Sequence, residues 1–181
     1  MQGTHRVRVS GISQPGEKML FVIDIGNTHT VLGVFEGDKL QQDWRISTDK
    51  TKTADEYGVL IQNICSTSGF SFKDFHAVAI SCVVPPLLQT FEDFCKKTLR
   101  LEPVLVEPGV KTGMPILMDN PREVGADRIV NAVAAYQEVH HACIVVDFGT
   151  ATTFDCISAE GEYMGGVIVP GIGISLEALF Q

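Results

Sequence analysis

The chain has 181 residues, 45% of them hydrophobic and 20% charged, which is enough for a packed core in one or two domains. Its net charge of −8 and its pI near 5.0 argue against broad binding to nucleic acids or to membrane surfaces. No apolar run in the sequence approaches the roughly 20 residues that a membrane-spanning helix requires.

Residues 1–18 differ in composition from the rest of the chain. They are polar, contain glycines and a proline, and lack the apolar core of a signal peptide. We interpret them as a tag, a misassigned start or a loose tail.

Five cysteines are scattered through the remainder, and no two of them have metal-binding or C-x-x-C spacing. They are Cys65, Cys82, Cys95, Cys143 and Cys156. This pattern predicts reduced core residues in a cytoplasmic protein.

The first recognisable motif is Asp24-Ile25-Gly26-Asn27-Thr28, a polar turn between predicted strands at Leu20–Ile25 and Val31–Phe35. Gly26 allows backbone N–H groups to come close to a ligand, and successive N–H groups in such a turn bind anions. Asp24, at the end of a strand, is suited to a hydrated Mg²⁺. The turn therefore predicts a site for nucleotide phosphates, although an ordinary hairpin corner has the same pattern.

The next segments alternate between strand and helix patterns. We predict a strand at Leu40–Ser47, a helix capped by Thr53, a strand at Ala77–Ile80, a helix at Leu87–Leu99 and a strand at Pro103–Val106. The order β-β-β-α-β-α-β is the ribonuclease-H-like arrangement of an α/β protein.

A loop rich in proline and glycine, residues 107–121, is long enough to suggest a function. It leads to Val124-Gly125-Ala126-Asp127-Arg128 at the start of a predicted helix. An acid at this position favours the helix dipole, which is the structural interpretation. The functional interpretation is that Asp127 accepts a hydrogen bond from a nucleophilic hydroxyl, while Arg128 orients it or pairs with another acid.

The first motif recurs as Asp147-Phe148-Gly149-Thr150-Ala151-Thr152, again between two apolar strands. Two copies of one phosphate turn indicate a duplicated domain, whose facing copies would clamp a nucleotide. The third strand of the second copy, Glu162–Val169, contains Gly165-Gly166. These glycines allow close approach of a flat ligand such as adenine, or they mark a bulged strand.

The second copy ends at Gln181, before the strand–helix–strand set that the first copy contains. Either the chain is a fragment, or its second sheet is incomplete and borrows a partner. We divide the sequence into a tail (1–18), a first ribonuclease-H-like domain with a substrate loop (19–121), and a linking helix with the first part of a second such domain (122–181).

Four motifs, in this order and spacing, resemble those of the type III pantothenate kinases. They are Asp24–Thr28, Gly125–Arg128, Asp147–Ala151, and Gly165-Gly166 with Pro170-Gly171. The resemblance covers Met19 to Gln181 and implies the actin-like ATPase fold, two ribonuclease-H-like domains around a nucleotide cleft. It implies transfer of the ATP γ-phosphoryl group to the 4′-hydroxyl of pantothenate, the first step of coenzyme A biosynthesis. It also implies a homodimer, Mg²⁺, and a monovalent cation, K⁺ or NH₄⁺.

The resemblance assigns roles residue by residue. The first ATP phosphate loop would consist of Asp24, Ile25, Gly26, Asn27, Thr28, His29, Thr30 and Val31. Asp127 would be the proton acceptor, within a pantothenate-contacting segment of Gly125, Ala126, Asp127 and Arg128. Asp147 would bind the monovalent cation, and Gly149 and Thr150 would contact ATP.

The sequence departs from the family pattern at two places. Met118 stands before Asp119-Asn120-Pro121, where the family has a tyrosine that contacts pantothenate. Methionine keeps the apolar contact and lacks the hydroxyl. The family's remaining pantothenate contact and much of its dimer surface correspond to residues beyond Gln181.

Two other functions fit parts of the pattern. A non-catalytic nucleotide-binding accessory protein would explain Met118 and the early end, but not the intact Asp24, Asp127 and Asp147. A related sugar or acid kinase would explain Met118, but not the match at Gly125–Arg128.

Overall fold

A computed structural model describes residues 19–106, 110 and 112–180 of the chain. These residues belong to two units, which meet in the chain after Val106. Our interpretation of residues 1–18 concerns residues outside the described ranges.

The first unit contains nine elements. In chain order they are β1 (Met19–Ile25), β2 (His29–Glu36), β3 (Lys39–Ser47), α1 (Ala54–Thr67), the 3₁₀ turn η1 (Phe72–Asp74), β4 (Phe75–Cys82), α2 (Pro85–Phe94), the π-helical turn η2 (Cys95–Leu99) and β5 (Val104–Val106).

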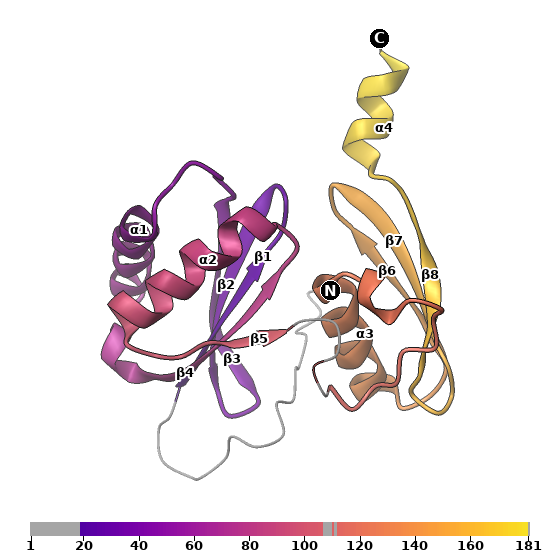
Figure 1. The fold of residues 1–181 in the computed structure, drawn as a ribbon, viewed down its shortest axis with the longest axis horizontal. Helices are drawn as coiled ribbons and strands as arrows, with labels where there is room; N and C mark the ends of the chain where they lie inside the picture. The colour runs from indigo at the N-terminus through magenta and orange to yellow at the C-terminus, as the bar shows by residue number, and fades with distance from the viewer. Residues whose placement is uncertain (1–18, 107–109, 111, 181) are drawn as a thin grey trace. The chain divides into compact units, whose positions relative to one another are not determined.

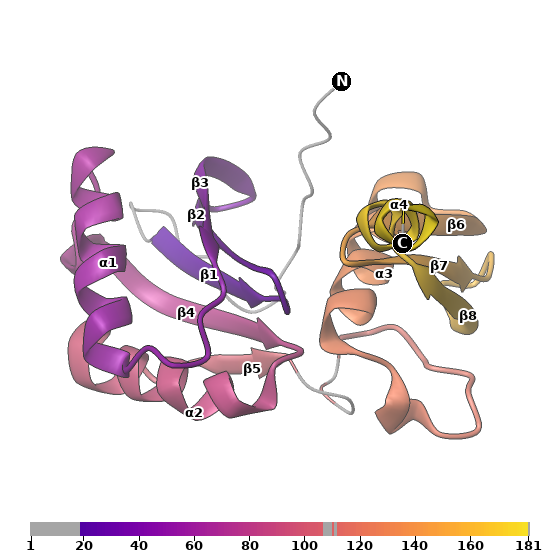
Figure 2. The same ribbon diagram turned by 90° about the horizontal axis from the view of Figure 1, so that it is seen from above.

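The strands of this unit form one sheet in the order β3-β2-β1-β4-β5. β1, β2 and β3 are antiparallel neighbours, whereas β4 runs parallel to β1 and β5 parallel to β4. Both α1 and α2 lie on the same face of this sheet (Figure 1, Figure 2). The ribonuclease-H-like order predicted from the sequence is confirmed.

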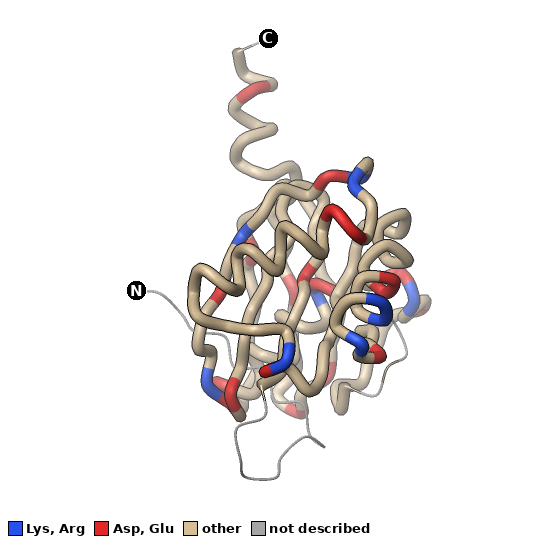
Figure 3. The backbone as a smooth tube through the Cα atoms, turned by 90° about the vertical axis from the view of Figure 1, so that its left-hand side faces the viewer, with Lys and Arg blue, Asp and Glu red and all other residues tan. Residues whose placement is uncertain are grey.

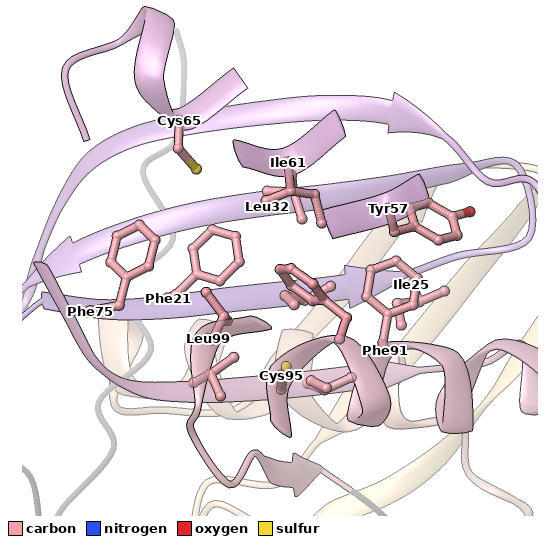
Figure 4. Close-up of a cluster of buried hydrophobic side chains, with 14 of the residues drawn as sticks. Phe21, Ile25, Leu32, Tyr57, Ile61, Cys65, Phe75, Phe91, Cys95 and Leu99 are labelled. Carbon is pink, nitrogen blue, oxygen red and sulfur yellow. The ribbon is translucent and has the colours of Figure 1, made fainter. Parts of the chain in front are cut away.

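The core of the first unit lies between the sheet and these two helices (Figure 4). Alternate residues of β1 point into it, because side chains along a strand alternate between faces; Phe21 and Ile25 are fully buried. Phe21 stacks on Phe75 of β4 with ring centroids 4.8 Å apart, and Tyr57 of α1 meets Phe91 of α2 at 4.5 Å. Ile25, the last residue of β1, belongs to the same core, which holds the strand end that leads into the first polar turn.

The helix predicted over Leu87–Leu99 has different bounds in the structure. α2 begins earlier, at Pro85, because proline suits the first turn of a helix, where its missing N–H costs nothing. It ends at Phe94 and continues as the wider turn η2, which Arg100 closes with a left-handed backbone at φ 59°.

In the second unit a helix covers one face of the sheet, and the other face is exposed. Its elements are the 3₁₀ turn η3 (Pro121–Glu123), α3 (Ala126–Val139), β6 (Cys143–Phe148), β7 (Ala151–Ile157), β8 (Tyr163–Pro170) and α4 (Ile172–Leu179). The strands form an antiparallel sheet in the order β6-β7-β8, which repeats the β1-β2-β3 meander. α3 packs on one face, where Ile129 and Ala132 meet Ile157 and Tyr163.

The face of this sheet away from α3 is apolar and exposed in the described residues. Ile144 is 64% exposed, Phe148 68% and Val167 57%. α4 buries none of its residues and extends beyond the strands (Figure 1). Cys156 lies on this face opposite Ile144, so the prediction that the cysteines are core residues is wrong for Cys156. Cys65 and Cys95 are buried, and all five cysteines are free.

Part of the loop that we grouped with the first domain packs on the second unit. Ile116 forms a bridge to Tyr163 of β8, and Met114, Ile116 and Met118 pack against the core around Tyr163. The apolar side chains of this loop therefore pack with the second unit, although the sequence led us to group the loop with the first domain.

No helix in the described ranges is both long and apolar enough to cross a membrane. Lys and Arg lie among Asp and Glu along the backbone (Figure 3). For example, Asp93 of α2 pairs with Lys97 of η2 at 3.0 Å.

The helix start at Thr53 offers a direct test of the local structure. Its side chain accepts a hydrogen bond from the N–H of Glu56, and the Glu56 carboxylate accepts one from the N–H of Thr53. Thr53→Ala removes half of this capping box and lowers the free energy of unfolding by about 1 kcal/mol in urea denaturation. Thr67→Ala, at the exposed other end of α1, changes it by less than about 0.5 kcal/mol. Equal effects of the two variants would contradict the capping role.

Candidate active site

The first polar turn, between β1 and β2, is held by backbone and threonine contacts. The N–H of Gly26 donates to the carbonyl of His29 at 3.0 Å. Thr48, just after β3, donates from its backbone to the carbonyl of Thr28 at 2.9 Å and from its hydroxyl to the carbonyl of Gly26 at 2.7 Å. The Thr48 and Thr30 hydroxyls lie 3.0 Å apart. This role of Thr48 could not be predicted from the sequence, because it depends on the register between β2 and β3.

The residues predicted to bind ATP in this turn fall into two groups. The side chains of Asp24, Asn27, Thr28 and His29 are exposed. Ile25 and Thr30 are fully buried, and they pair with each other across β1 and β2, so they shape the turn from within. A Cβ atom at Gly26 would lie 3.0 Å from the carbonyl oxygen of His29, so a larger residue would fit only if the turn shifted slightly.

The second polar turn, between β6 and β7, has the same construction. The N–H of Gly149 donates to the carbonyl of Ala151, the first residue of β7, at 2.9 Å. Gly171, after β8, donates to the carbonyl of Thr150 at 3.1 Å, and a Cβ atom there would meet the carbonyl oxygens of Thr150 and Gly149. In both turns the N–H of a glycine donates to the carbonyl of the first residue of the next strand, which agrees with the internal repeat.

Asp127 lies in the first turn of α3 and is half-buried. Its Oδ1 accepts a hydrogen bond from the backbone N–H of Arg128 at 2.8 Å. One turn along the helix, Asn131 donates from Nδ2 to Oδ2 of Asp147 at 3.2 Å. The structure therefore brings the predicted proton acceptor and the predicted cation ligand, Asp147, to the same side of α3.

The pKa of Asp127 is raised above its ordinary value of 3.8. Burial of the carboxylate is the main cause, and the charge of Asp147 adds to the rise. The hydrogen bond from the Arg128 backbone opposes this rise. A carboxylate held in this way binds a proton more readily than an exposed aspartate.

Arg128 pairs with an acid that the sequence analysis did not single out, Asp155 of β7. Nε of Arg128 lies 2.8 Å from Oδ1 of Asp155, and Nη2 lies 2.6 Å from the same oxygen. The hydroxyl of Tyr163 donates to this Oδ1 at 2.5 Å, and Thr153 donates to Oδ2 at 3.3 Å. Of the two roles that we considered for Arg128, the structure shows the pairing. The available signal was an acid in the middle of an apolar strand, Phe154-Asp155-Cys156.

Gly166 leaves room for this ion pair. A Cβ atom at Gly166 would collide with the carbonyl oxygen of Phe154, lie 2.6 Å from Nη2 of Arg128 and 2.9 Å from Oδ1 of Asp155. Gly165 has a left-handed backbone with φ of 116°, and the register between β7 and β8 shifts beside it. The glycine pair therefore forms a bulged strand, as one of the two interpretations expected.

The described residues contain no cluster of three or more His, Cys, Asp or Glu side chains arranged around a metal position. Asp24 and Asp147, the two predicted cation ligands, are exposed carboxylates at the ends of β1 and β6. Met118 is partly buried against the core around Tyr163, and its sulfur would lie 4.0 Å from a Cβ atom on Gly165.

The raised pKa of Asp127 predicts a stabilising substitution. At pH 7 the buried carboxylate is charged and lowers the stability, so Asp127→Asn raises the melting temperature by a few degrees. Below an ordinary aspartate pKa of about 4, the carboxyl is protonated in both the folded and unfolded states, and the difference disappears. Thermal melts at pH 7 and pH 3 measure both effects.

The matched control is Asp55→Asn, because Asp55 occupies the same position in the first turn of α1 and is exposed. An exposed charge there interacts favourably with the helix dipole, so its removal brings no gain in stability. A less stable Asp127→Asn variant at pH 7 would contradict the assigned environment of Asp127.

Comparisons with known proteins agree with this geometry. The family model for type III pantothenate kinase matches residues 20–181. The type III pantothenate kinases of Syntrophobacter fumaroxidans and Syntrophus aciditrophicus are each 60% identical over 162 residues, which is 90% of this chain and 63% and 64% of theirs. The chain thus spans less than two thirds of the length of these curated relatives.

Solved structures show the fold alone. The ethanolamine utilization protein EutJ from Carboxydothermus hydrogenoformans has a TM-score of 0.51 at 14% identity, covering 95% of this chain and 59% of that one. The Aquifex aeolicus Ppx/GppA phosphatase has the same TM-score and identity, covering 89% and 55%. Both have the actin-like ATPase fold. From the family model and the identity to the kinases, we conclude that this chain belongs to the type III pantothenate kinase family.

Proposed function

We propose that this protein transfers the γ-phosphoryl group of ATP to the 4′-hydroxyl of pantothenate, the first step of coenzyme A biosynthesis. We further propose that it acts in the cytoplasm as a homodimer. Membership of the kinase family supports the reaction, and the environment of Asp127 is the observation that carries it.

Asp127 would accept the proton of the attacking hydroxyl. Its carboxylate is half-buried, is hydrogen-bonded to the backbone of Arg128, and has a raised pKa, which makes it a stronger base than an exposed aspartate. Phosphoryl transfer depends mainly on positioning and charge neutralisation, and the proton leaves late in a loose transition state. A weak but well-placed base suits this chemistry.

The two polar turns would bind ATP. In the first turn the phosphates would meet backbone N–H groups around Gly26 and the exposed side chains of Asn27 and Thr28. In the second, Gly149 and Thr150 would contact the nucleotide. Main-chain donors are well suited to an acidic protein, because they bind an anion without adding side-chain charge.

The family implies Mg²⁺ and a monovalent cation, K⁺ or NH₄⁺, and the donors present fit these ions. Asp24 and Asp147 offer exposed carboxylate oxygens, the ligand type that hard cations prefer. The bond from Asn131 to Asp147 fixes one oxygen of that carboxylate. We assign Mg²⁺ to Asp24 and the monovalent cation to Asp147; when bound, both would neutralise phosphate charge.

A coupled assay of ADP release tests the proposal, with ATP, Mg²⁺ and pantothenate in K⁺ and then in Na⁺ alone. We expect pantothenate-dependent turnover that requires K⁺. Asp127→Asn lowers kcat by on the order of 10²- to 10⁴-fold, because the proton acceptor is lost. The control Asp93→Asn, on α2, leaves kcat unchanged.

The assay is run on the 181-residue chain and on this chain extended with the C-terminal part of the Syntrophobacter fumaroxidans relative that it does not cover. Absence of pantothenate-dependent turnover in both proteins and both salts would overturn the kinase proposal. It would favour a nucleotide-binding accessory protein. Turnover of another alcohol, with none of pantothenate, would favour a related sugar or acid kinase.

Met118 predicts a specific change in substrate affinity. Met118→Tyr restores the hydroxyl that the family places near pantothenate, and one added hydrogen bond lowers KM for pantothenate by roughly 3- to 10-fold. KM for ATP does not change. Met114→Tyr, elsewhere in the same loop, is the control and brings no such gain. An unchanged or higher KM for pantothenate in Met118→Tyr would contradict the placement of Met118 beside the substrate.

A further inference from the structure

The first turn of α3 carries Asp127, yet it begins without a side-chain cap. The residue at the cap position is Gly125, which offers no side chain to the unpaired N–H groups of the first turn. Uncapped helix ends fray, and a fraying first turn would leave the Asp127 carboxylate poorly placed. With no side-chain cap, contacts from outside the helix contribute more to the placement of this turn.

The Arg128 side chain makes that contact. Its guanidinium reaches β7 and binds Asp155 through Nε at 2.8 Å and Nη2 at 2.6 Å, while its backbone N–H donates to Asp127 at 2.8 Å. One residue therefore links the carboxylate of Asp127 to the middle strand of the sheet.

The anchor itself is fixed and buried. The side chain of Asp155 is 1% exposed and that of Arg128 is 11% exposed. The Tyr163 hydroxyl donates to the same oxygen of Asp155 that Arg128 binds. Buried ion pairs add little net stability compared with apolar packing, so we look for the contribution of this pair in the geometry that it enforces.

We propose that Asp155 and Tyr163 are positioning residues that act through Arg128 to hold Asp127 in its place at the start of α3. The proposal rests on the proposed kinase function, in which Asp127 accepts the proton. Neither residue is expected to touch the substrates. Their loss lowers kcat, because the proton acceptor is misplaced, and leaves KM for ATP unchanged.

Tyr163→Phe is the first test, since it removes one hydroxyl and keeps the buried ring. We expect kcat to fall on the order of tenfold with KM for ATP unchanged. The matched control is Tyr136→Phe, because the Tyr136 hydroxyl donates to the carbonyl of Ala159 at 2.9 Å and ties the other end of α3 to the same sheet. This control keeps the kcat of the unmodified protein. An equal kcat loss in both variants, or no loss in Tyr163→Phe, would overturn the proposal.

Asp155→Asn tests whether Asp155 affects kcat through the position of Asp127. The substitution keeps the shape and removes the charge, and it lowers kcat further than Tyr163→Phe. In an Asp127→Asn background the same substitution causes no additional loss, since there is no proton acceptor left to misplace. A general structural defect would instead reduce kcat by the same factor in both backgrounds, and that result would overturn the proposal.

Hydrogen exchange separates this proposal from the kinase proposal. The amides of Arg128 and Ile129 exchange faster in Tyr163→Phe than in the unmodified protein, and Tyr136→Phe does not change them. This readout needs no turnover. If the unmodified protein fails to phosphorylate pantothenate, the kinase proposal falls, and unchanged exchange in Tyr163→Phe would separately overturn the positioning role.

Discussion

A buried ion pair between Arg128 and Asp155 ties the start of α3 to the middle strand of the second sheet. Three neighbouring features depend on it. Gly166 must lack a side chain to leave room for the pair, and Tyr163 must be placed so that its hydroxyl donates to Asp155. The bulge beside Gly165 keeps β8 paired with β7 at this place. This charged contact thus accompanies the apolar core around Tyr163, and Asp127 lies one residue away from it.

The two polar turns are held by contacts from a neighbouring segment. Thr48 bonds to the first turn and Gly171 to the second. The chain carries a net charge of −8, and its basic residues lie among acidic ones (Figure 3). In an acidic protein of this kind, the proposed binding of phosphates at the turns would depend on main-chain N–H groups more than on side-chain charge.

The sequence predicted the features that follow from local pattern. The cap at Thr53 and the second polar turn are encoded by residues close in the chain, and the strand order of the first unit was inferred from the succession of strand and helix patterns. Contacts between distant residues were missed, because register and packing decide them: Thr48 behind the first turn, and Asp155 beneath Arg128. Cys156 was assigned to the core for the same reason, since apolar neighbours do not reveal which sheet face a helix covers.

Backbone chemical-shift mapping by NMR is a direct test of pantothenate binding at the start of α3. Pantothenate is titrated into the isotope-labelled protein, and the shifts of all assigned amides are followed. We expect the changes to concentrate at Gly125–Arg128 and near Met118, and we expect ATP instead to shift the amides of the two polar turns. Changes confined to other parts of the chain, with Gly125–Arg128 unaffected at saturating pantothenate, would show that the substrate does not bind there.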